Sequence, residues 1–485
     1  MKFAHYFFPF VATIVCTVSA SATTPVVTVS SPTSGSQDSS PVTFAATASS
    51  SQCSKGIAAM RIYTVPGVSA YTVDASTLNT QLTLSPGTYN TVVQAWDNCG
   101  GVGKTPVTIT VATSGGGGGT GGAPPKFLYS TDYSGGKVHG YLVNPSTGVI
   151  TANGQNPPWA HWGPTRVASD KGGYRLYVIN WGSKDVDAYF INRDNGYITP
   201  VPGSPFTIGN NPTGVAVEPS GKYVYVTAEN NYVYGFAVES NGSLTPVAGS
   251  PFLTQSNPNT LAIDPTGRYL YTDDGDNANK IDAFSINETN GALTPVPGSP
   301  FAQTSSGCDD GGNDMAVDPS GKFLLLAQYC VGTEVYSIDS ANGSIAQVAG
   351  SPFFIPAAQG PQGYIASISV DPLDRYVFAN AVFCDSGCST TIETYSFNSS
   401  TGAMTFLNSG GASCGEYIRT DPSGKFLYSI SQTDDSFCSV YPTPVSAIDG
   451  FSINQSNGML SVVPGSPFAS PNADWFSQDG LVITP

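Results

Sequence analysis

A repeat of about fifty residues constrains the fold of this chain more than any other feature. The segments PTGVAVEPSGKYVYV at 212, PNTLAIDPTGRYLYT at 258, GGNDMAVDPSGKFLLL at 311 and EYIRTDPSGKFLYS at 416 are near copies. An acidic residue ahead of Pro or Lys sets the register, at Asp170, Glu218, Asp264, Asp318, Asp371 and Asp421. Repeats of this length are typical of propellers and solenoids.

Each repeat predicts four antiparallel strands, because its apolar residues recur at every second position. A helical solenoid would need spacings of three and four, which these segments lack. Six complete units run from about 163 to 468. The C-terminal DGLVITP resembles a first strand, and KFLYSTDYSGGKVHGYLVNPSTGVIT near residue 126 supplies three more. Joined, they complete a seventh blade, which closes the ring and leaves no sheet edge exposed.

The repeat resembles a known family of seven-bladed propeller lactonases, which includes 6-phosphogluconolactonase and carboxymuconate-cyclising enzymes. The resemblance rests on the DPSGK turn, the third strands VYGFAV and IDAFSI, and the endings SLTPVAGSPF and ALTPVPGSPF. It covers residues 126–485 and implies an all-β propeller over residues 124–485. It implies the activity less directly, because one fold hosts many functions.

A different pattern precedes the propeller. The Gly-rich segment 113–123 predicts a flexible linker. Residues 25–112 show short alternating segments between turn clusters, which predict a small β-sandwich. The stretch SPGTYNTVVQAWDNCGG resembles the penultimate strand of bacterial immunoglobulin-like domains, with Tyr89 placed like a tyrosine corner. Cys53 and Cys99 are the cysteines of this part, and we expect them to pair.

The first 22 residues have the Lys, the apolar run and the small-residue ending of a secretory signal, so we expect an exported protein: periplasmic, cell-surface or extracellular. Eight cysteines remain after cleavage, an even number that favours disulfides over zinc. In the propeller we expect the pairs Cys308–Cys330, Cys384–Cys388 and Cys414–Cys438. The net charge of −16 argues against a nucleic-acid partner, and no later apolar run would span a bilayer.

The residues that open each repeat differ, and we expect them to ring the central channel. The residues five positions before the repeated acid are Thr165, Thr213, Asn259, Asn313, Ala366 and Glu416, and the closing strand adds Asp479. The residues one position later are Arg166, Gly214, Thr260, Asp314, Ser367, Tyr417 and Gly480. Glu416, Asp479, Asn259 and Asn313 offer oxygen ligands for calcium, with Asp314 and Tyr417 beside them as ligand-binding residues. The same side chains would equally serve strand ends and ordered water.

The loop PPWAHWGPT places Trp159, His161 and Trp162 near the channel mouth. The rings would stack on a sugar or lactone and His161 would act as a base, or all three would plug the channel. Enzymes of the resembled family carry His-Pro-His at the start of a blade, whereas this chain has Gly163, Pro164 and Thr165. At this position the chain therefore lacks the two histidines that the resemblance would imply.

Two functional hypotheses follow. In the first, the protein is a lactonase-like hydrolase, with His161, Arg166 and Glu416 as catalytic residues. In the second, it is a non-enzymatic extracellular module for binding or assembly, which associates with itself or with a surface partner. A lactone panel with and without calcium would separate them.

Overall fold

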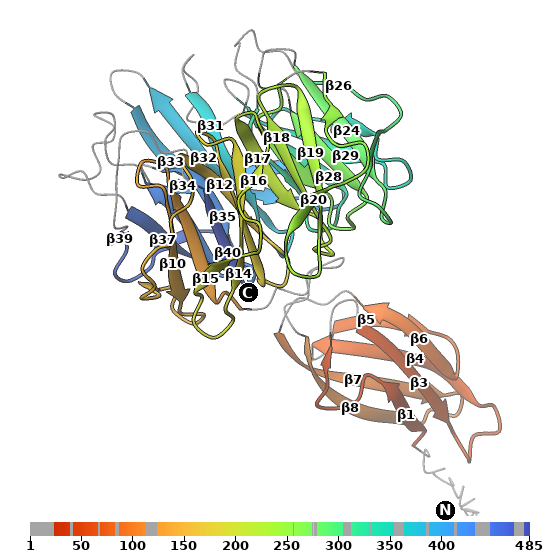
Figure 1. Ribbon diagram of the computed structural model, residues 1–485. Coiled ribbons are helices and arrows are strands. Elements are labelled where there is room, and N and C mark those ends of the chain that lie inside the picture. Colours follow the sequence, from red (N-terminus) through yellow and green to blue (C-terminus); the bar gives the residue numbers. More distant parts are fainter. Residues whose placement is uncertain are drawn as a thin grey trace, which may run out of the picture. The chain divides into compact units, whose positions relative to one another are not determined.

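The computed structural model describes residues 24–38, 42–65, 68–82, 87–111, 124–255, 257–273, 275, 279–303, 312–328, 332–353, 363–384, 388–411, 415–431, 447–469 and 480–485. All regular elements in these ranges are β-strands (Figure 1), so no described helix has the length and apolarity needed to cross a membrane. The chain divides into two compact units, Met1–Ser114 and Gly115–Pro485. The expected signal and linker, 1–22 and 113–123, lie outside the described residues.

The N-terminal unit is a pair of sheets around one core. One sheet contains β1 (Val26–Ser31), β3 (Val42–Ser49) and β6 (Thr77–Leu82); the other contains β2 (Gln37–Asp38), β8 (Val102–Val111), β7 (Gly87–Asp97), β4 (Ile57–Val65) and β5 (Val68–Val73). Phe44 from the first sheet and Met60, Ile62 and Ile109 from the second are completely buried in the shared core. The Cys53–Cys99 disulfide is present, as the sequence predicted. The immunoglobulin-like assignment stays a prediction.

The C-terminal unit is a seven-bladed propeller, which confirms the predicted fold class. Each blade is numbered along the chain and its strands are given from the channel outward. Blade 1 contains β12 (Pro164–Ser169), β13 (Arg175–Asn180), β14 (Asp185–Ile191) and β15 (Ile198–Pro200); blade 2, β17 (Pro212–Val217), β18 (Tyr223–Ala228), β19 (Tyr232–Val238) and β20 (Leu244–Pro246); blade 3, β22 (Leu261–Ile263), β23 (Tyr269–Asp273), β24 (Lys280–Ile286) and β25 (Leu293–Pro295).

The remaining blades follow the same plan. Blade 4 contains β27 (Gly312–Val317), β28 (Phe323–Gln328), β29 (Gly332–Ile338) and β30 (Ile345–Gln347); blade 5, β31 (Gly363–Val370), β32 (Tyr376–Cys384), β33 (Cys388–Phe397) and β34 (Met404–Gly410); blade 6, β35 (Gly415–Thr420), β36 (Phe426–Ser431), β37 (Ala447–Ile453) and β38 (Leu460–Val462). Short strands β16 (Phe206–Thr207), β21 (Phe252–Leu253), β26 (Phe301–Ala302) and β39 (Phe468–Ala469) also pair with the third strands.

Blade 7 closes the ring from both ends of this unit (Figure 1). Its inner strand is β40 (Leu481–Thr484), and β9 (Phe127–Asp132), β10 (Lys137–Val143) and β11 (Ile150–Ala152) follow outward. Leu481 pairs with Ser130 and Thr484 with Phe127, in antiparallel register. Thr131 holds the entry to β40, since its hydroxyl oxygen accepts from Gly480 N at 2.6 Å and its own N–H donates to the Gly480 carbonyl at 3.1 Å. The predicted closing strand is confirmed.

The repeated acidic residue builds the turn between the first two strands of a blade. In blade 4, Asp318 Oδ1 accepts from Lys322 N and Phe323 N, both at 2.7 Å, and Oδ2 accepts from the Ser320 hydroxyl. Asp264 and Asp421 make the same bonds in their blades. These carboxylates are buried, so they compensate backbone donors that the tight turn would leave unpaired. The repeated acid is therefore structural.

The GSPF ending is also structural. The Ser hydroxyl accepts a backbone N–H from the middle of the third strand, as Ser299 does from Ala283 N at 2.9 Å, and the following Phe begins the short additional strand. Between blades, a buried tyrosine of the second strand donates to the turn glycine of the next blade. Tyr225 donates to the Gly291 carbonyl at 2.8 Å, and Tyr428 to Gly148 at 2.8 Å. The repeated letters thus hold strands and blades in register.

Candidate functional site

A β-bulge near the start of the inner strands sets which residues face the channel. The register between first and second strands shifts across one residue in five blades, and the skipped residues are Thr165, Thr213, Asn313, Ala366 and Glu416. A bulged residue has no partner in the ladder, and the strand bends there. Two side chains of this set reach the next blade: Thr213 Oγ1 donates to the Pro258 carbonyl at 2.6 Å, and Asn313 Nδ2 donates to the Ile365 carbonyl at 2.8 Å.

The residues one place later meet across the channel. Arg166 belongs to blade 1, yet it donates to Thr260 Oγ1 of blade 3 at 3.2 Å and to the Asn313 carbonyl of blade 4 at 3.3 Å. Its guanidinium also lies 5.1 Å from the ring centre of Tyr417 in blade 6. Blades 1, 3, 4 and 6 are not all neighbours, so these groups can meet only at the centre of the ring. Arg166 therefore spans the channel.

Asp314, Ser367 and Arg419 form a second layer of contacts at the same centre. Arg419 donates through Nη1 to Asp314 Oδ2 at 2.8 Å and to Ser367 Oγ at 3.0 Å, and through Nη2 to Asp314 Oδ1 at 3.3 Å. The Ser367 hydroxyl donates to Asp314 Oδ2 at 2.6 Å. Burial alone would raise the pKa of Asp314, but Arg419 and Arg166 hold it below its ordinary value. Asp314 is therefore a carboxylate, and the two arginines leave this cluster with one net positive charge.

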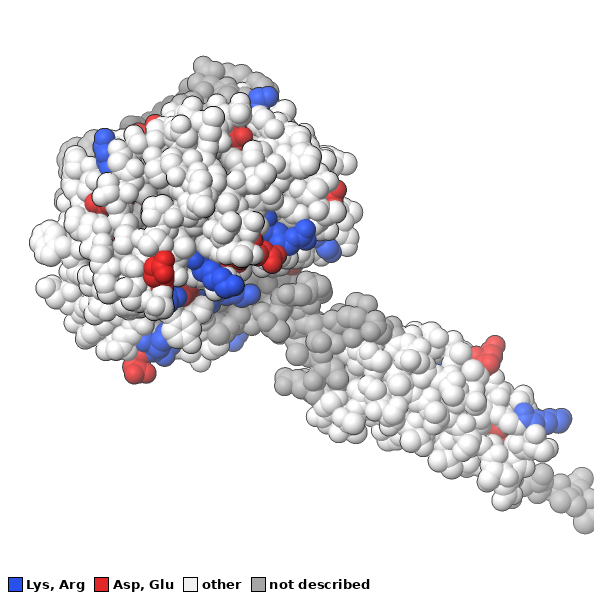
Figure 2. All heavy atoms as spheres, turned by 45° about the vertical axis from the view of Figure 1, so that its right-hand side comes forward, with Lys and Arg blue, Asp and Glu red and all other residues white. Residues whose placement is uncertain are grey.

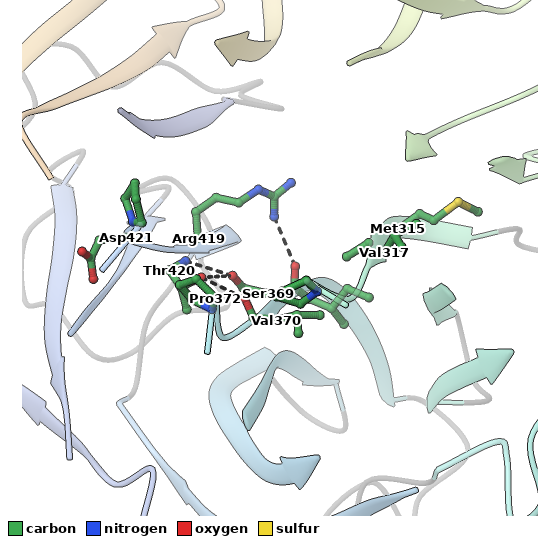
Figure 3. A pocket seen from close by; sticks show the side chains of 12 residues that line it. Met315, Val317, Ser369, Val370, Pro372, Arg419, Thr420 and Asp421 are labelled. Carbon is green, nitrogen blue, oxygen red and sulfur yellow. Dashed lines mark hydrogen bonds between the residues drawn. The ribbon is translucent and has the colours of Figure 1, made fainter. Parts of the chain in front are cut away.

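A cavity of about 320 Å³ adjoins this cluster (Figure 3). It is lined by the second halves of β27, β31 and β35 and by the prolines that follow them, Pro319, Pro372 and Pro422. Arg419 forms part of its wall, with 33% of the side chain exposed and Nη1 3.4 Å from the Ile368 carbonyl. The volume is that of a small ligand site. A bound anion or carbonyl oxygen would meet a guanidinium already held in place.

Among the predicted site residues, the structure brings Arg166, Asp314 and Tyr417 together. Asn313 adds its carbonyl, while its amide bonds to blade 5. The backbone N–H of Asn259 donates to Asp273 at 3.2 Å. The side chain of Glu416 and the whole of Asp479 lie outside the described residues. The proposed calcium site of Glu416, Asp479, Asn259 and Asn313 stays a prediction.

The other predicted residues lie beside blade 1 and, for Trp159, also beside β10 of blade 7. His161 Nδ1 is 3.2 Å from Asp187 Oδ1, and its backbone N–H donates to Asp187 Oδ2 at 3.0 Å. Trp159 and Trp162 are exposed, and Lys137 Nζ lies 5.4 Å from the ring centre of Trp159. No interaction within the described residues joins His161 to Arg166 or Arg419. Within the described residues, His161 and the arginine cluster therefore form two separate sets of contacts, and the single site that the sequence predicted stays a prediction.

The propeller cysteines are only partly described. Cys384 and Cys388 are register partners where β32 turns into β33, which places their backbones opposite each other. Cys308, Cys330, Cys414 and Cys438 lie outside the described residues. All three expected pairings stay predictions.

Sequence reasoning missed Arg419 and Asp187. Two positions before the repeated acid, the six complete blades carry Ala168, Ala216, Ala262, Ala316, Ser369 and Arg419. A single Arg at a position that is otherwise small could have been noticed in the sequence. Residues two apart on a strand share a face, so Arg419 lies on the same face of its strand as Tyr417. Asp187 has a weaker signal, since the third strands often carry an acidic residue at this point, including Asp282, Glu334 and Asp449.

Comparison with known proteins agrees with this architecture. The family model described as "Lactonase, 7-bladed beta-propeller" matches residues 124–308 and, overlapping them, 229–380. The periplasmic gluconolactonase PpgL of Pseudomonas aeruginosa aligns with a TM-score of 0.57 and 16% identity, covering 74% of this chain and 99% of that one. A Bacteroides uniformis protein, provisionally assigned as a 6-phosphogluconolactonase, gives 0.57 and 17%, covering 75% and 97%. No curated protein sequence matches.

Proposed function

Because the chain belongs to the lactonase family of seven-bladed β-propellers, we propose that it binds and hydrolyses a small lactone in its central channel. The observation that carries this proposal is the pair Arg166 and Arg419, whose guanidinium carbons lie 5.1 and 5.7 Å from the centre of the Tyr417 ring. Attack of water on a lactone carbonyl creates an oxyanion, and guanidinium N–H groups placed beforehand stabilise it. The product is a hydroxy acid, whose carboxylate suits the same two groups.

The described cluster supports charge stabilisation better than proton transfer. Asp314 is an unsuitable base, because both of its oxygens accept from Arg419 and its pKa is lowered. His161 bonds to Asp187 instead of joining the channel cluster. We therefore assign the arginines to substrate orientation and oxyanion stabilisation. Export also belongs to the proposal: the first 22 residues resemble a secretory signal, and the Cys53–Cys99 disulfide suits an oxidising compartment.

The test measures proton release from a panel of aldonolactones and their phosphorylated forms, with calcium and with chelator. We expect hydrolysis above the spontaneous rate, and a decrease in kcat/KM of about 10²–10³ in Arg166→Gln, as for loss of one oxyanion donor. Lys171→Gln removes an exposed cation on the turn that precedes β13 and should leave the rate unchanged.

Two results would contradict the enzymatic proposal. One is a rate that equals spontaneous hydrolysis for every lactone, and the other is an Arg166→Gln variant with unchanged kcat/KM. Calorimetry with the open aldonates separates the alternatives, because binding without turnover would favour the non-enzymatic binding module.

A further inference from the structure

A compact set of nitrogen and oxygen ligands lies beside blade 1, apart from the arginine cluster. One ligand atom each from His161, Asp185 and Asp187 lies within 4.8 Å of the others. Asp185 and Asp187 both project from β14, two residues apart and therefore on one face of the strand. His161 comes from the loop before β12, and Asp187 accepts its backbone N–H at 3.0 Å.

The two carboxylates lack a compensating charge. Both residues are buried, and within the described residues the one ion pair to either of them is that of His161 Nδ1 with Asp187 Oδ1 at 3.2 Å. Two adjacent carboxylates with one imidazole are short of positive charge, which a divalent cation would supply.

Asn180 provides a second, independent observation. Its side chain is completely buried, and Nδ2 donates to Asp185 Oδ1 at 2.7 Å and to Asp187 Oδ2 at 2.8 Å. Its Oδ1 has no hydrogen-bond partner within the described residues. Rotation of the amide by half a turn would direct Oδ1 at the carboxylates, which is repulsive unless a cation lies between them. A cation would thus give the unpaired Asn180 oxygen a partner.

We propose that His161, Asp185 and Asp187 bind one divalent cation of the zinc type, with Asn180 Oδ1 or water as a further ligand. The imidazole favours first-row transition ions over calcium or magnesium, which prefer oxygen alone. Bonds of about 2.1 Å in tetrahedral geometry place neighbouring ligand atoms about 3.4 Å apart, close to the 3.2 Å between His161 Nδ1 and Asp187 Oδ1. The His161 side chain is 47% exposed, so it is free to adjust.

Hydrogen bonds around the carboxylates orient them for this role. Ser183 Oγ donates to Asp185 Oδ1 at 3.0 Å, and Ser204 Oγ to Asp187 Oδ1 at 3.3 Å. Such outer contacts fix ligand geometry in metal sites. The other cluster of potential metal ligands that the described residues contain, Cys53, Asp97 and Cys99, has both cysteines joined in a disulfide and so lacks free thiolates.

The test uses the full chain with its disulfides intact, without a histidine tag, after treatment with chelator and dialysis. Co²⁺ is titrated and followed by visible d–d absorption, and Zn²⁺ is titrated by calorimetry. We expect one ion per chain, with binding at least tenfold weaker in His161→Ala and in Asp187→Asn. Asp194→Asn removes an exposed carboxylate of the same blade and should bind like the parent.

Three outcomes would overturn the proposal: no binding of either ion, affinity unchanged in both ligand variants, or a sulfur-to-cobalt charge-transfer band, which would assign the ion to cysteine. Thermal unfolding of each variant shows whether a loss of binding reflects a loss of folding, and His161→Ala decides the question because its side chain is half exposed. The measurement does not use hydrolysis, so its result is independent of the lactonase test.

Discussion

Asp374 has a backbone conformation that the repeat otherwise gives to glycine. Three residues after the repeated acid, the other complete blades carry Gly173, Gly221, Gly267, Gly321 and Gly424, all with φ between 64° and 76°. Asp374 has φ 61°, in the left-handed region that is costly for a residue with a side chain. Burial raises its pKa to about 7, and the nearby Asp318 carboxylate of blade 4 contributes to the rise. Blade 5 therefore contains a strained turn next to a second carboxylate.

Asp374→Gly should raise the stability of the propeller by about 1–3 kcal/mol, the range of strain stored by such a conformation. The gain should depend on pH. A raised pKa in the folded state stabilises the fold below the unfolded-state pKa of about 4, and this contribution is lost as pH rises through about 7. The difference between variant and parent should therefore increase from pH 4 to 7 and then level off.

Urea unfolding at pH 4.5, 6 and 8 measures this difference, with the exposed Asp194→Asn as the control for removal of a charge. A difference that stays constant across the three pH values would show that the protonation of Asp374 does not change between them. A less stable variant would show that the turn is not strained.

Among the strands, the Arg419–Asp314 pair connects β35 of blade 6 to β27 of blade 4, with Ser367 of blade 5 between them. Arg419→Gln leaves a buried carboxylate without its cation and should destabilise the propeller by about 3–5 kcal/mol. Asp314→Asn in the same chain removes that charge and should restore much of the loss. Arg268→Gln, an exposed arginine that stacks on its own neighbour Tyr269, should change stability by less than about 0.5 kcal/mol.

Denaturant midpoints of the two single variants and the double variant give the coupling between the groups. Additive losses of stability would mean that Arg419 and Asp314 do not stabilise each other, so the pairing of their charges would not explain the stability of the channel.

The strands also show where sequence reasoning succeeded and where it failed. The blades were predictable because the DPSGK-type turn and the GSPF ending each make a structural hydrogen bond in several blades, and so they recur. The bulge that separates the two predicted rings, as at Thr213 and Asn313, cannot be read from alternation, so the sequence could not show that Arg166, one place later, spans the channel. His161 and Asp187 lie 26 residues apart with the two strands β12 and β13 between them, and their contact depends on the folded loop.

At the scale of the whole molecule, closure depends on the short strand β40. Removing residues 480–485 should leave β9 as an open edge and expose Leu128, which is completely buried in the closed ring. We expect association at micromolar concentration and a lower thermal midpoint, measured by light scattering and by calorimetry. Removing Pro485 alone should change neither, since the ladder ends at Thr484. A shortened chain that stays monomeric with an unchanged midpoint would contradict this account of closure.

The same closure affects the order of events during synthesis. Phe127 and Thr484 are direct partners, although 357 residues separate them along the chain. Blades earlier in the chain can form before β40 is made, but the seventh must wait with three of its strands already made. During that interval the edge of β9 is unpaired, and any matching strand, including one from another copy of the chain, can pair with it. A chaperone that shields β9 until β40 is available would thus favour a closed monomer over chains that have exchanged strands.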